Sequence, residues 1–164
     1  MYSSYLYGRV KNFVDQYGQG IAQSIRGTGL FFTAVTAQSI LESGYGDRIP
    51  TNSNNFAGIK YNPSLQGVTG YVLADTSEVI NGMKVRVKAK FSKFKDVESG
   101  FKAHVSVLLG DRYAQARQVA KSPEEQILMI AKAGYSTTPP QKYLDSMSGI
   151  IDAVRDYSKL GRIS

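Results

Sequence analysis

The sequence predicts an α+β fold that is mainly helical, in which a small β-hairpin interrupts a helical body. Apolar residues recur at helical spacing over most of the chain, whereas residues 83–91 alternate apolar with polar side chains, the period of a strand. The 164 residues contain no internal repeat, low-complexity tract or long linker. We therefore expect one domain over 1–164, with an α-lobe of about 1–55 and 96–164 and a β-lobe of about 56–95.

The composition excludes several kinds of chemistry. A chain of this length can bury roughly 70% of the surface that its unfolded form exposes, so it needs no metal or disulfide to fold. It has no cysteine, which excludes disulfide frameworks, thiolate zinc sites and cysteine nucleophiles. Its single histidine, His104, excludes clusters of imidazole ligands. We expect neither a metal nor a cofactor.

The charge balance points to an anionic partner. Lysine and arginine outnumber aspartate and glutamate by 20 to 13, a net charge of +7, which suits nucleic acid, a membrane surface or the bacterial envelope. The longest apolar run falls well short of the roughly 18 residues that span a bilayer, so we expect no transmembrane segment. The N-terminal stretch MYSSYLYGRVKNF lacks a charged region followed by an apolar core, so no cleaved secretory signal is visible.

Two helices are expected at the start of the chain. The first should end near Gly18 and Gly20. The second, Leu30–Ser43, has apolar residues on two adjacent stripes and should be largely buried, with Glu42 at its buried edge. Glycines end this helix and an asparagine-rich loop follows. The apolar positions that predict the first helix are Leu6, Val10, Phe13, Val14 and Tyr17.

A hairpin and three further helices should complete the fold. The strand at 83–91 should be half-buried and pair with Gly70–Asp75 across a turn at or near Asn81-Gly82. Its outer face carries Lys84, Arg86, Lys88 and Lys90, which either keep an edge soluble or attract anionic polymers. Helices are expected after Asp96, from the capping box Ser122-Pro123-Glu124-Glu125 to about Gly134, and from about Gln141 to Ser158.

Glu42 is the strongest candidate for acid–base chemistry. Its neighbours one and two turns earlier include Gln38, Val35 and Phe31, so its carboxyl should be partly desolvated, which raises a carboxyl pKa. The nearby helix C-terminus disfavours negative charge and acts in the same direction. A carboxylic acid that stays protonated near neutral pH is what a general acid must be.

The residues after Glu42 suggest a carbohydrate groove. Asn54, Asn55 and the backbone around Gly58 can hydrogen-bond hydroxyl and N-acetyl groups. Taken singly, such residues are more often core or surface filler, and only their concentration around one glycine-rich loop is informative. The aromatic side chains that could stack on sugar rings are Tyr45, Phe56, Tyr61 and Tyr71.

Several separated motifs resemble glycoside hydrolase family 73, the bacterial endo-β-N-acetylglucosaminidases of the lysozyme-like superfamily. The likeness spans about Leu30 to Tyr143 in the right order. It rests on AQSILESGYG (37–46), NNFAGIK (54–60), Thr76-Ser77-Glu78, Ala89-Lys90-Phe91 with Phe94, Arg112-Tyr113 and AGYST (133–137), followed by Pro139 and Tyr143.

The resemblance implies a lysozyme-like helical domain and a small β-lobe that flank a groove for the glycan strands of peptidoglycan. By position, Glu42 would be the general acid and Glu78 the base that activates water, while Tyr135 would support substrate or intermediate. The substrate-binding residues that we expect from the motifs and the loop are Gln38, Tyr45, Asn55, Phe56, Lys60, Tyr61 and Tyr143.

Three departures from the family pattern matter. Tyr45 stands where tryptophan is frequent, Val79 follows the second glutamate where tyrosine is common, and Thr138 replaces an aspartate before proline. The second change weakens the assignment of Glu78, which could instead be a solvated turn residue. Asp47 and Asp75 are reserve candidates, and the acetamido oxygen of N-acetylglucosamine can itself serve as nucleophile.

The expected activity is cleavage of the β-1,4 bond between N-acetylglucosamine and N-acetylmuramic acid by a monomer. It would act in the periplasm or cell wall, whether secreted, delivered as an effector or encoded by a phage. A muramidase or a lytic transglycosylase of the same fold is the alternative. A non-enzymatic module that binds glycan or nucleic acid is a further one, but no recognition helix or nucleic-acid motif supports it. We expect His104 to be a hydrogen-bonded core or rim residue.

Overall fold

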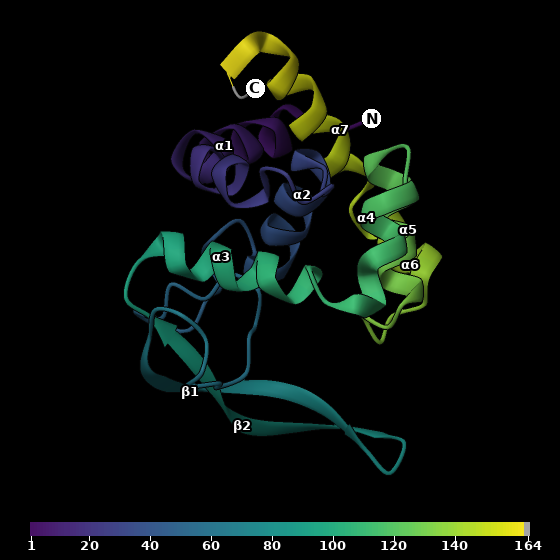
Figure 1. Ribbon diagram of the computed structural model, residues 1–164. Helices are drawn as coiled ribbons and strands as arrows, with labels where there is room; N and C mark the ends of the chain where they lie inside the picture. The colour runs from purple at the N-terminus through teal and green to yellow at the C-terminus, as the bar shows by residue number, and fades with distance from the viewer. Residues whose placement is uncertain (163–164) are drawn as a thin grey trace.

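The computed structural model describes the backbone of residues 1–162 and the side chains of residues 1–160. Figure 1 shows a body of helices with a long two-stranded hairpin beneath it, and α3 lies between the two. A short 3₁₀ turn precedes α4 and a π-helical turn follows α7. The elements are α1 (Ser4–Ile25), α2 (Phe32–Ser43), β1 (Val68–Ile80), β2 (Met83–Phe94), α3 (Val97–Leu108), α4 (Ala114–Val119), α5 (Pro123–Lys132), α6 (Pro140–Ser146) and α7 (Ser148–Tyr157).

Helix α1 is longer than the sequence predicted. It begins at a cap in which the Ser3 side chain accepts a hydrogen bond from the backbone N–H of Leu6. The predicted end near Gly18 and Gly20 is wrong, because the helix continues to Ile25. A glycine inside a helix costs about 1 kcal/mol relative to alanine. The buried side chains of Ile21 and Ile25 offset that cost by packing in the core.

Helix α2 is the centre of the body. Every residue from Ala34 to Ile40 is buried, and α1, α5 and α7 pack around it. The helix ends where Gly44 adopts a left-handed conformation with φ 54°, and its N–H bonds to the carbonyls of Ile40 and Leu41. The predicted burial and the predicted end of this helix are both confirmed.

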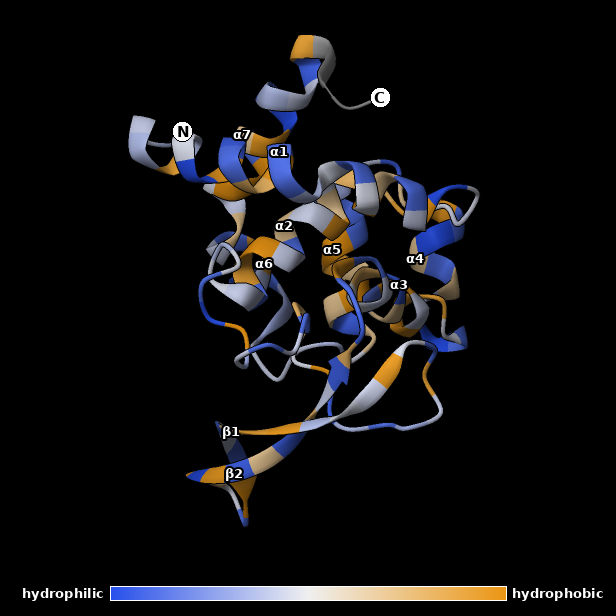
Figure 2. Cartoon of the chain, turned by 90° about the vertical axis from the view of Figure 1, so that its left-hand side faces the viewer, coloured by the Kyte–Doolittle hydropathy of each residue, from blue (hydrophilic) through white to orange (hydrophobic). Residues whose placement is uncertain are grey.

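The hairpin has the predicted turn but extends further than predicted. Strands β1 and β2 are antiparallel with Ile80 opposite Met83, and the turn residues Asn81 and Gly82 both have positive φ, 51° and 78°. The expectation of a half-buried strand is wrong near the turn, where Met83 is 71% exposed. Figure 2 shows apolar residues at this tip, away from the helices. Only the last part of β2 reaches the body.

The C-terminal half confirms two predicted helix starts and corrects one helix. The side chains of Asp96 and Ser122 cap α3 and α5 by accepting N–H groups three residues later. The single helix predicted from Gln141 to Ser158 is wrong, because the chain breaks at Met147 into α6 and α7. Met147 is fully buried, and the break lets both short helices face the core. Helix α4, six residues long, is too short to show a periodic pattern.

The loop after α2 joins the two lobes through polar contacts. The Asn55 side chain donates to the carbonyls of Ile59 and Ser92 at 2.9 and 3.0 Å and accepts the N–H of Ile59 at 3.0 Å. On the other side, Gly100 of α3 faces the backbone carbonyl of Asn54 so closely that a Cβ there would overlap it. These contacts set the position of the hairpin relative to the helices. Within the described residues, no helix combines the length and apolarity needed to cross a membrane.

The substitution Gly100→Ala should destabilise the protein, because its methyl group would collide with the Asn54 carbonyl. Overpacking of this kind costs about 1 to 3 kcal/mol. The control is Gly20→Ala in α1, where a Cβ meets nothing within 4 Å, and there we expect a gain of up to about 1 kcal/mol. Urea unfolding monitored by circular dichroism measures both. Equal stabilities for the two variants would contradict the proposed close contact.

Candidate active site

Two adjoining cavities form a groove between the helical body and the hairpin. The larger, of about 500 Å³, is lined by loop residues 57–60, α3 and residues 134–137. The smaller, of about 410 Å³, lies against Ile49, Pro50 and both strands. Glu42 and Gly58 line both, so Glu42 stands where the cavities meet. Each cavity has the size of a small-molecule binding site, roughly 300 to 1,000 Å³.

Glu42 occupies the last turn of α2 and faces this groove. The residue is exposed, which corrects the expectation of a buried edge: the hairpin stands away from the helices and leaves the groove open to solvent. The surrounding protein still displaces enough water to raise the pKa of the carboxyl above its ordinary value, and a hydrogen bond from Tyr143 opposes part of that shift. The result is an acid that solvent and substrate can reach and that holds its proton more firmly than usual.

Two tyrosines approach Glu42 from the C-terminal third of the chain. Tyr143 of α6 is 4% exposed, and its hydroxyl donates to Oε1 of Glu42 at 3.2 Å. Tyr135 follows α5, and its ring centroid lies 6.3 Å from that of Tyr143. Burial, and secondarily the charge of Glu42, raises the pKa of both phenols well above the ordinary tyrosine value. Both hydroxyls are therefore neutral at neutral pH.

His104 connects Tyr135 to α2. The imidazole is 1% exposed, with Nε2 at 3.3 Å from the Tyr135 hydroxyl and Nδ1 at 3.3 Å from Oγ of Ser39. Burial lowers the pKa of His104 to about 4, so the ring is neutral at neutral pH. The expectation of a hydrogen-bonded core or rim residue is confirmed, although the ring also borders the larger cavity.

The second carboxylate is less clearly placed than Glu42. Glu78 is half-buried on β1 and forms an ion pair with Lys60, which lines the larger cavity. Glu78 itself is not among the residues that line either cavity. Asp75 lines the smaller cavity with Glu42, and its Oδ1 lies 3.4 Å from Nζ of Lys88. Asp47 pairs with Arg9 and lies outside both cavities.

Three of the residues expected to bind substrate are buried in the fold instead. Phe56 is 2% exposed and its ring stacks on Phe101 at 4.7 Å between centroids, so it cannot stack on a sugar. Asn55 borders the smaller cavity, but its amide is already engaged in the joint with the hairpin. Gln38 is fully buried one turn before Glu42. It does not line either cavity.

The remaining expected aromatic contacts lie outside the two cavities. Tyr45 packs under the guanidinium of Arg9, whose Cζ is 4.6 Å from the ring centroid. Tyr61 and Tyr71 contact each other with centroids 5.2 Å apart, near the base of the hairpin. Both are partly exposed, at 38% and 46%, and are therefore available to a ligand longer than the groove.

The groove also contains residues that sequence reasoning did not select. Arg112, Tyr113 and Val107 line the larger cavity opposite the loop 57–60. The pair Arg112-Tyr113 was visible in the sequence as one of the family motifs, but nothing in its spacing indicated a groove. The sequence analysis did not select the other lining residues either. They are Ala57, Ile59, Gly134, Ser136 and Thr137 in the larger cavity, and Arg48, Ile49, Pro50, Ala74, Thr76 and Phe91 in the smaller.

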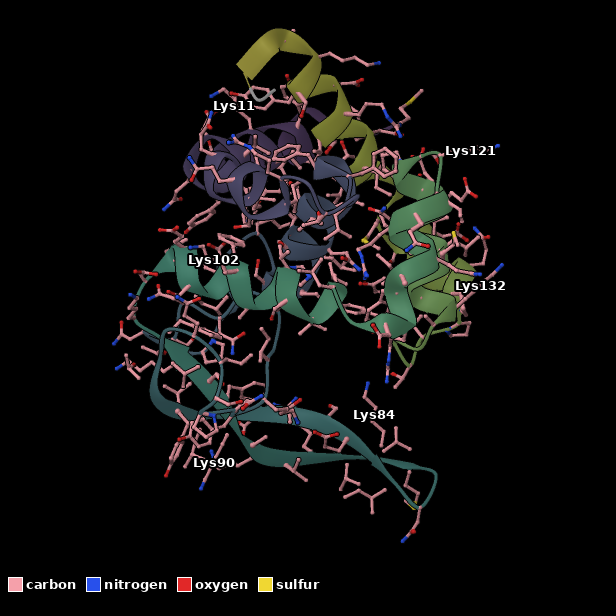
Figure 3. The ribbon with its side chains drawn as sticks, in the orientation of Figure 1. Lys11, Lys84, Lys90, Lys102, Lys121 and Lys132 are labelled. Atoms are coloured by element: carbon pink, nitrogen blue, oxygen red, sulfur yellow. The ribbon has the colours of Figure 1, made fainter. Side chains whose placement is uncertain are left out.

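The lysines labelled in Figure 3 lie on several sides of the molecule. Figure 3 labels lysines from several parts of the chain, two of them, Lys84 and Lys90, on the same strand β2, with Lys90 directed away from the helical body. A nucleic-acid-binding protein usually concentrates its cations on one face. The arrangement in Figure 3 gives no such stripe among the labelled residues, which are Lys11, Lys84, Lys90, Lys102, Lys121 and Lys132.

A helical lobe and a β-hairpin on either side of a groove, with one protonatable glutamate at its centre, define a glycosidase of the lysozyme-like class. The sequence profile of the glucosaminidase family, described as mannosyl-glycoprotein endo-beta-N-acetylglucosaminidase, matches residues 18–156. The chain belongs to this family, glycoside hydrolase family 73, as the resemblance predicted.

Known proteins agree with this assignment. The chain is 34% identical over 111 residues to the peptidoglycan hydrolase FlgJ of Pseudomonas aeruginosa, covering 64% of this chain. Among solved structures, it is similar to a truncated glycoside hydrolase domain of Salmonella typhimurium FlgJ, with TM-score 0.68, 28% identity and coverage of 90% of this chain and 98% of that one. A mutant peptidoglycan hydrolase from Sphingomonas sp. A1 superposes with TM-score 0.73 and 25% identity over 88% of this chain and 96% of the other.

The curated relatives are longer proteins. The match covers 27% of Pseudomonas aeruginosa FlgJ, and 41% of Vibrio cholerae FlgJ, which is 30% identical over 83% of this chain. What the chain shares with them is therefore one glycoside hydrolase domain.

The substitution Tyr143→Phe should raise the pKa of Glu42. The hydroxyl of Tyr143 donates to the charged carboxylate and so favours its ionised form, and its removal leaves desolvation unopposed. A carbon-13 NMR titration of the Glu42 side-chain carboxyl measures the change. Tyr61→Phe, which removes a hydroxyl near the hairpin, is the control and should leave the titration unchanged. A lower or equal pKa in Tyr143→Phe would show that the hydrogen bond does not act on the carboxylate.

Proposed function

We propose that the protein hydrolyses peptidoglycan at the β-1,4 bond between N-acetylglucosamine and N-acetylmuramic acid. The observation that carries the proposal is Glu42, an accessible carboxylic acid with a raised pKa where the two cavities of the groove meet. A glycan strand laid along both cavities would place a glycosidic bond beside this side chain. The family to which the chain belongs and the printed names of its relatives support the same substrate.

In the proposed mechanism Glu42 acts as general acid. Protonated before reaction, it transfers its proton to the glycosidic oxygen as the bond to the sugar carbon breaks. The carboxylate that remains keeps the hydrogen bond from Tyr143, which is stronger once its acceptor is charged. Tyr143 therefore acts mainly after proton transfer, and the surrounding burial acts mainly before it.

We propose that the carboxylate that accepts a proton from the attacking water lies on the hairpin. Glu78 is the family's expected second carboxylate, and its ion pair with Lys60 links it to the groove wall. Asp75 is the alternative because it lines the smaller cavity with Glu42. A substrate-assisted route, in which the sugar's acetamido oxygen attacks, needs neither of them.

The proposed site of action is the cell wall, outside the cytoplasmic membrane. The relatives' printed name, peptidoglycan hydrolase, supports this placement. A net charge of +7 distributed over the surface favours approach to an anionic envelope through long-range attraction. Such attraction should weaken as salt is raised, because the Debye length falls from about 10 Å at 0.1 M to about 3 Å at 1 M.

Replacing the acid should abolish most turnover. In Glu42→Gln the amide cannot donate a proton, and positioned acid catalysis contributes about 10²- to 10⁴-fold, so we expect a fall in kcat of at least about 10²-fold. Folding should be nearly unaffected, because the side chain is exposed. Release of soluble fragments from purified peptidoglycan measures activity. Asp47→Asn, which alters a carboxylate outside the groove, is the matched control and should stay active; activity in Glu42→Gln would mean that another group is the acid.

The products identify the bond that is cut. Mass spectrometry of borohydride-reduced fragments should show reduced N-acetylglucosamine at the new ends. Reduced N-acetylmuramic acid would identify a muramidase instead. Anhydro-muropeptides, together with full activity of Glu78→Gln, would identify a lytic transglycosylase, which needs no base-activated water.

A further inference from the structure

His104, the single histidine of the chain, has no part in the mechanism above, although it lies behind one of the groove's tyrosines. It comes from α3, whereas Tyr135 follows α5 and Ser39 lies on α2. The imidazole thus joins three segments at the wall of the larger cavity. Because the ring is neutral at neutral pH, one nitrogen donates and the other accepts, and the neighbouring groups decide which.

The direction of these hydrogen bonds follows from Ser39. A serine hydroxyl has one proton, and that of Ser39 donates to the carbonyl of Val35 at 2.9 Å, a shorter contact than the 3.3 Å to His104. Ser39 Oγ therefore accepts from His104, which puts the ring proton on Nδ1. Nε2 is left without a proton, and it can only accept the hydroxyl proton of Tyr135.

We propose that His104 is a positioning residue that fixes the Tyr135 hydroxyl as a donor toward itself, so that the phenol oxygen faces the groove as a hydrogen-bond acceptor. Tyr143, whose ring lies 6.3 Å away, has the opposite polarity, because its proton points at Glu42. Of the two tyrosines beside Glu42, Tyr143 thus donates a hydrogen bond to the carboxyl, and Tyr135 accepts a hydrogen bond from the sugar. The group that Tyr135 fits is an N–H or O–H donor on the bound glycan.

This inference rests on the proposed function only for what Tyr135 contacts. The polarity of the chain from Val35 through Ser39 and His104 to Tyr135 is a property of the protein alone. It is fixed by buried side chains, since Ser39 is fully buried and His104 is 1% exposed. The imidazole therefore exposes almost no surface to water, which strengthens its hydrogen bonds to Ser39 and Tyr135.

Nitrogen-15 NMR of the unmodified protein tests the polarity directly. With one histidine in the chain, long-range ¹H–¹⁵N correlations of the imidazole need no assignment. At pH 7 we expect the neutral tautomer protonated at Nδ1, and an Nε2-protonated ring would overturn the proposal. Ser39→Ala removes the acceptor for Nδ1–H and should convert this pattern into a mixture of tautomers.

Kinetics test the role in catalysis. His104→Leu removes the acceptor, and we expect kcat to fall about fivefold with little change in KM, because one neutral hydrogen bond contributes about 1 kcal/mol. His104→Gln, whose amide oxygen can accept the hydroxyl, should recover part of the loss. Thermal unfolding of each variant checks that it folds.

The decisive comparison is made in a Tyr135→Phe background. If His104 acts only through the Tyr135 hydroxyl, adding His104→Leu to Tyr135→Phe should cause no further fall in kcat. An equal fall in kcat in both backgrounds would show that His104 has only a structural role, and would overturn the proposal. Failure of the proposed function is distinguishable, because the tautomer measurement tests the hydrogen-bond chain even in an unmodified protein that shows no activity on peptidoglycan.

Discussion

The site depends on the burial of residues 34–40 of α2. Because every residue from Ala34 to Ile40 packs against other helices, the axis and rotation of this helix are fixed by the core and not by the groove. The helix then ends at Ser43, because Gly44 directly after it adopts a left-handed conformation. Glu42 therefore lies at the end of a buried helical segment and yet faces the groove. That combination allows an acid to be both precisely placed and accessible to a polymer.

Opposing effects set the protonation of Glu42. The protein around the carboxyl disfavours its charge, and the hydrogen bond from Tyr143 favours it, with the first effect larger. Exposure to the groove limits how far the balance can move, because solvent screens a carboxyl that it can reach. A general acid must lose and regain its proton in each catalytic cycle, so a pKa that is raised only to a limited extent suits this role. The neutral tyrosine hydroxyls add polarity to this environment without adding charge.

The sequence predicted what local patterns control. The cap at Ser122, the turn at Asn81 and the end of α2 each depend on a few neighbouring residues, and all three were found as expected. The misplaced features depend on distant contacts: Phe56 belongs to the core because Phe101 of α3 covers it, and no spacing within its own loop could indicate that. For the site, sequence selected Glu42 as the acid, but the direction of the hydrogen bonds around it required three-dimensional contacts between segments.

The hydrogen bond between Glu42 and Tyr143 joins residues 101 positions apart. While the chain is being synthesised, α2 emerges long before α6, and an unfolded glutamate ionises like any other, near pH 4.3. The pKa of the carboxyl is raised only in the folded protein, and the hydrogen bond that opposes part of that shift forms only once Tyr143 reaches Glu42. An unfolded chain thus carries the glutamate but neither the desolvation nor the hydrogen bond that sets its protonation.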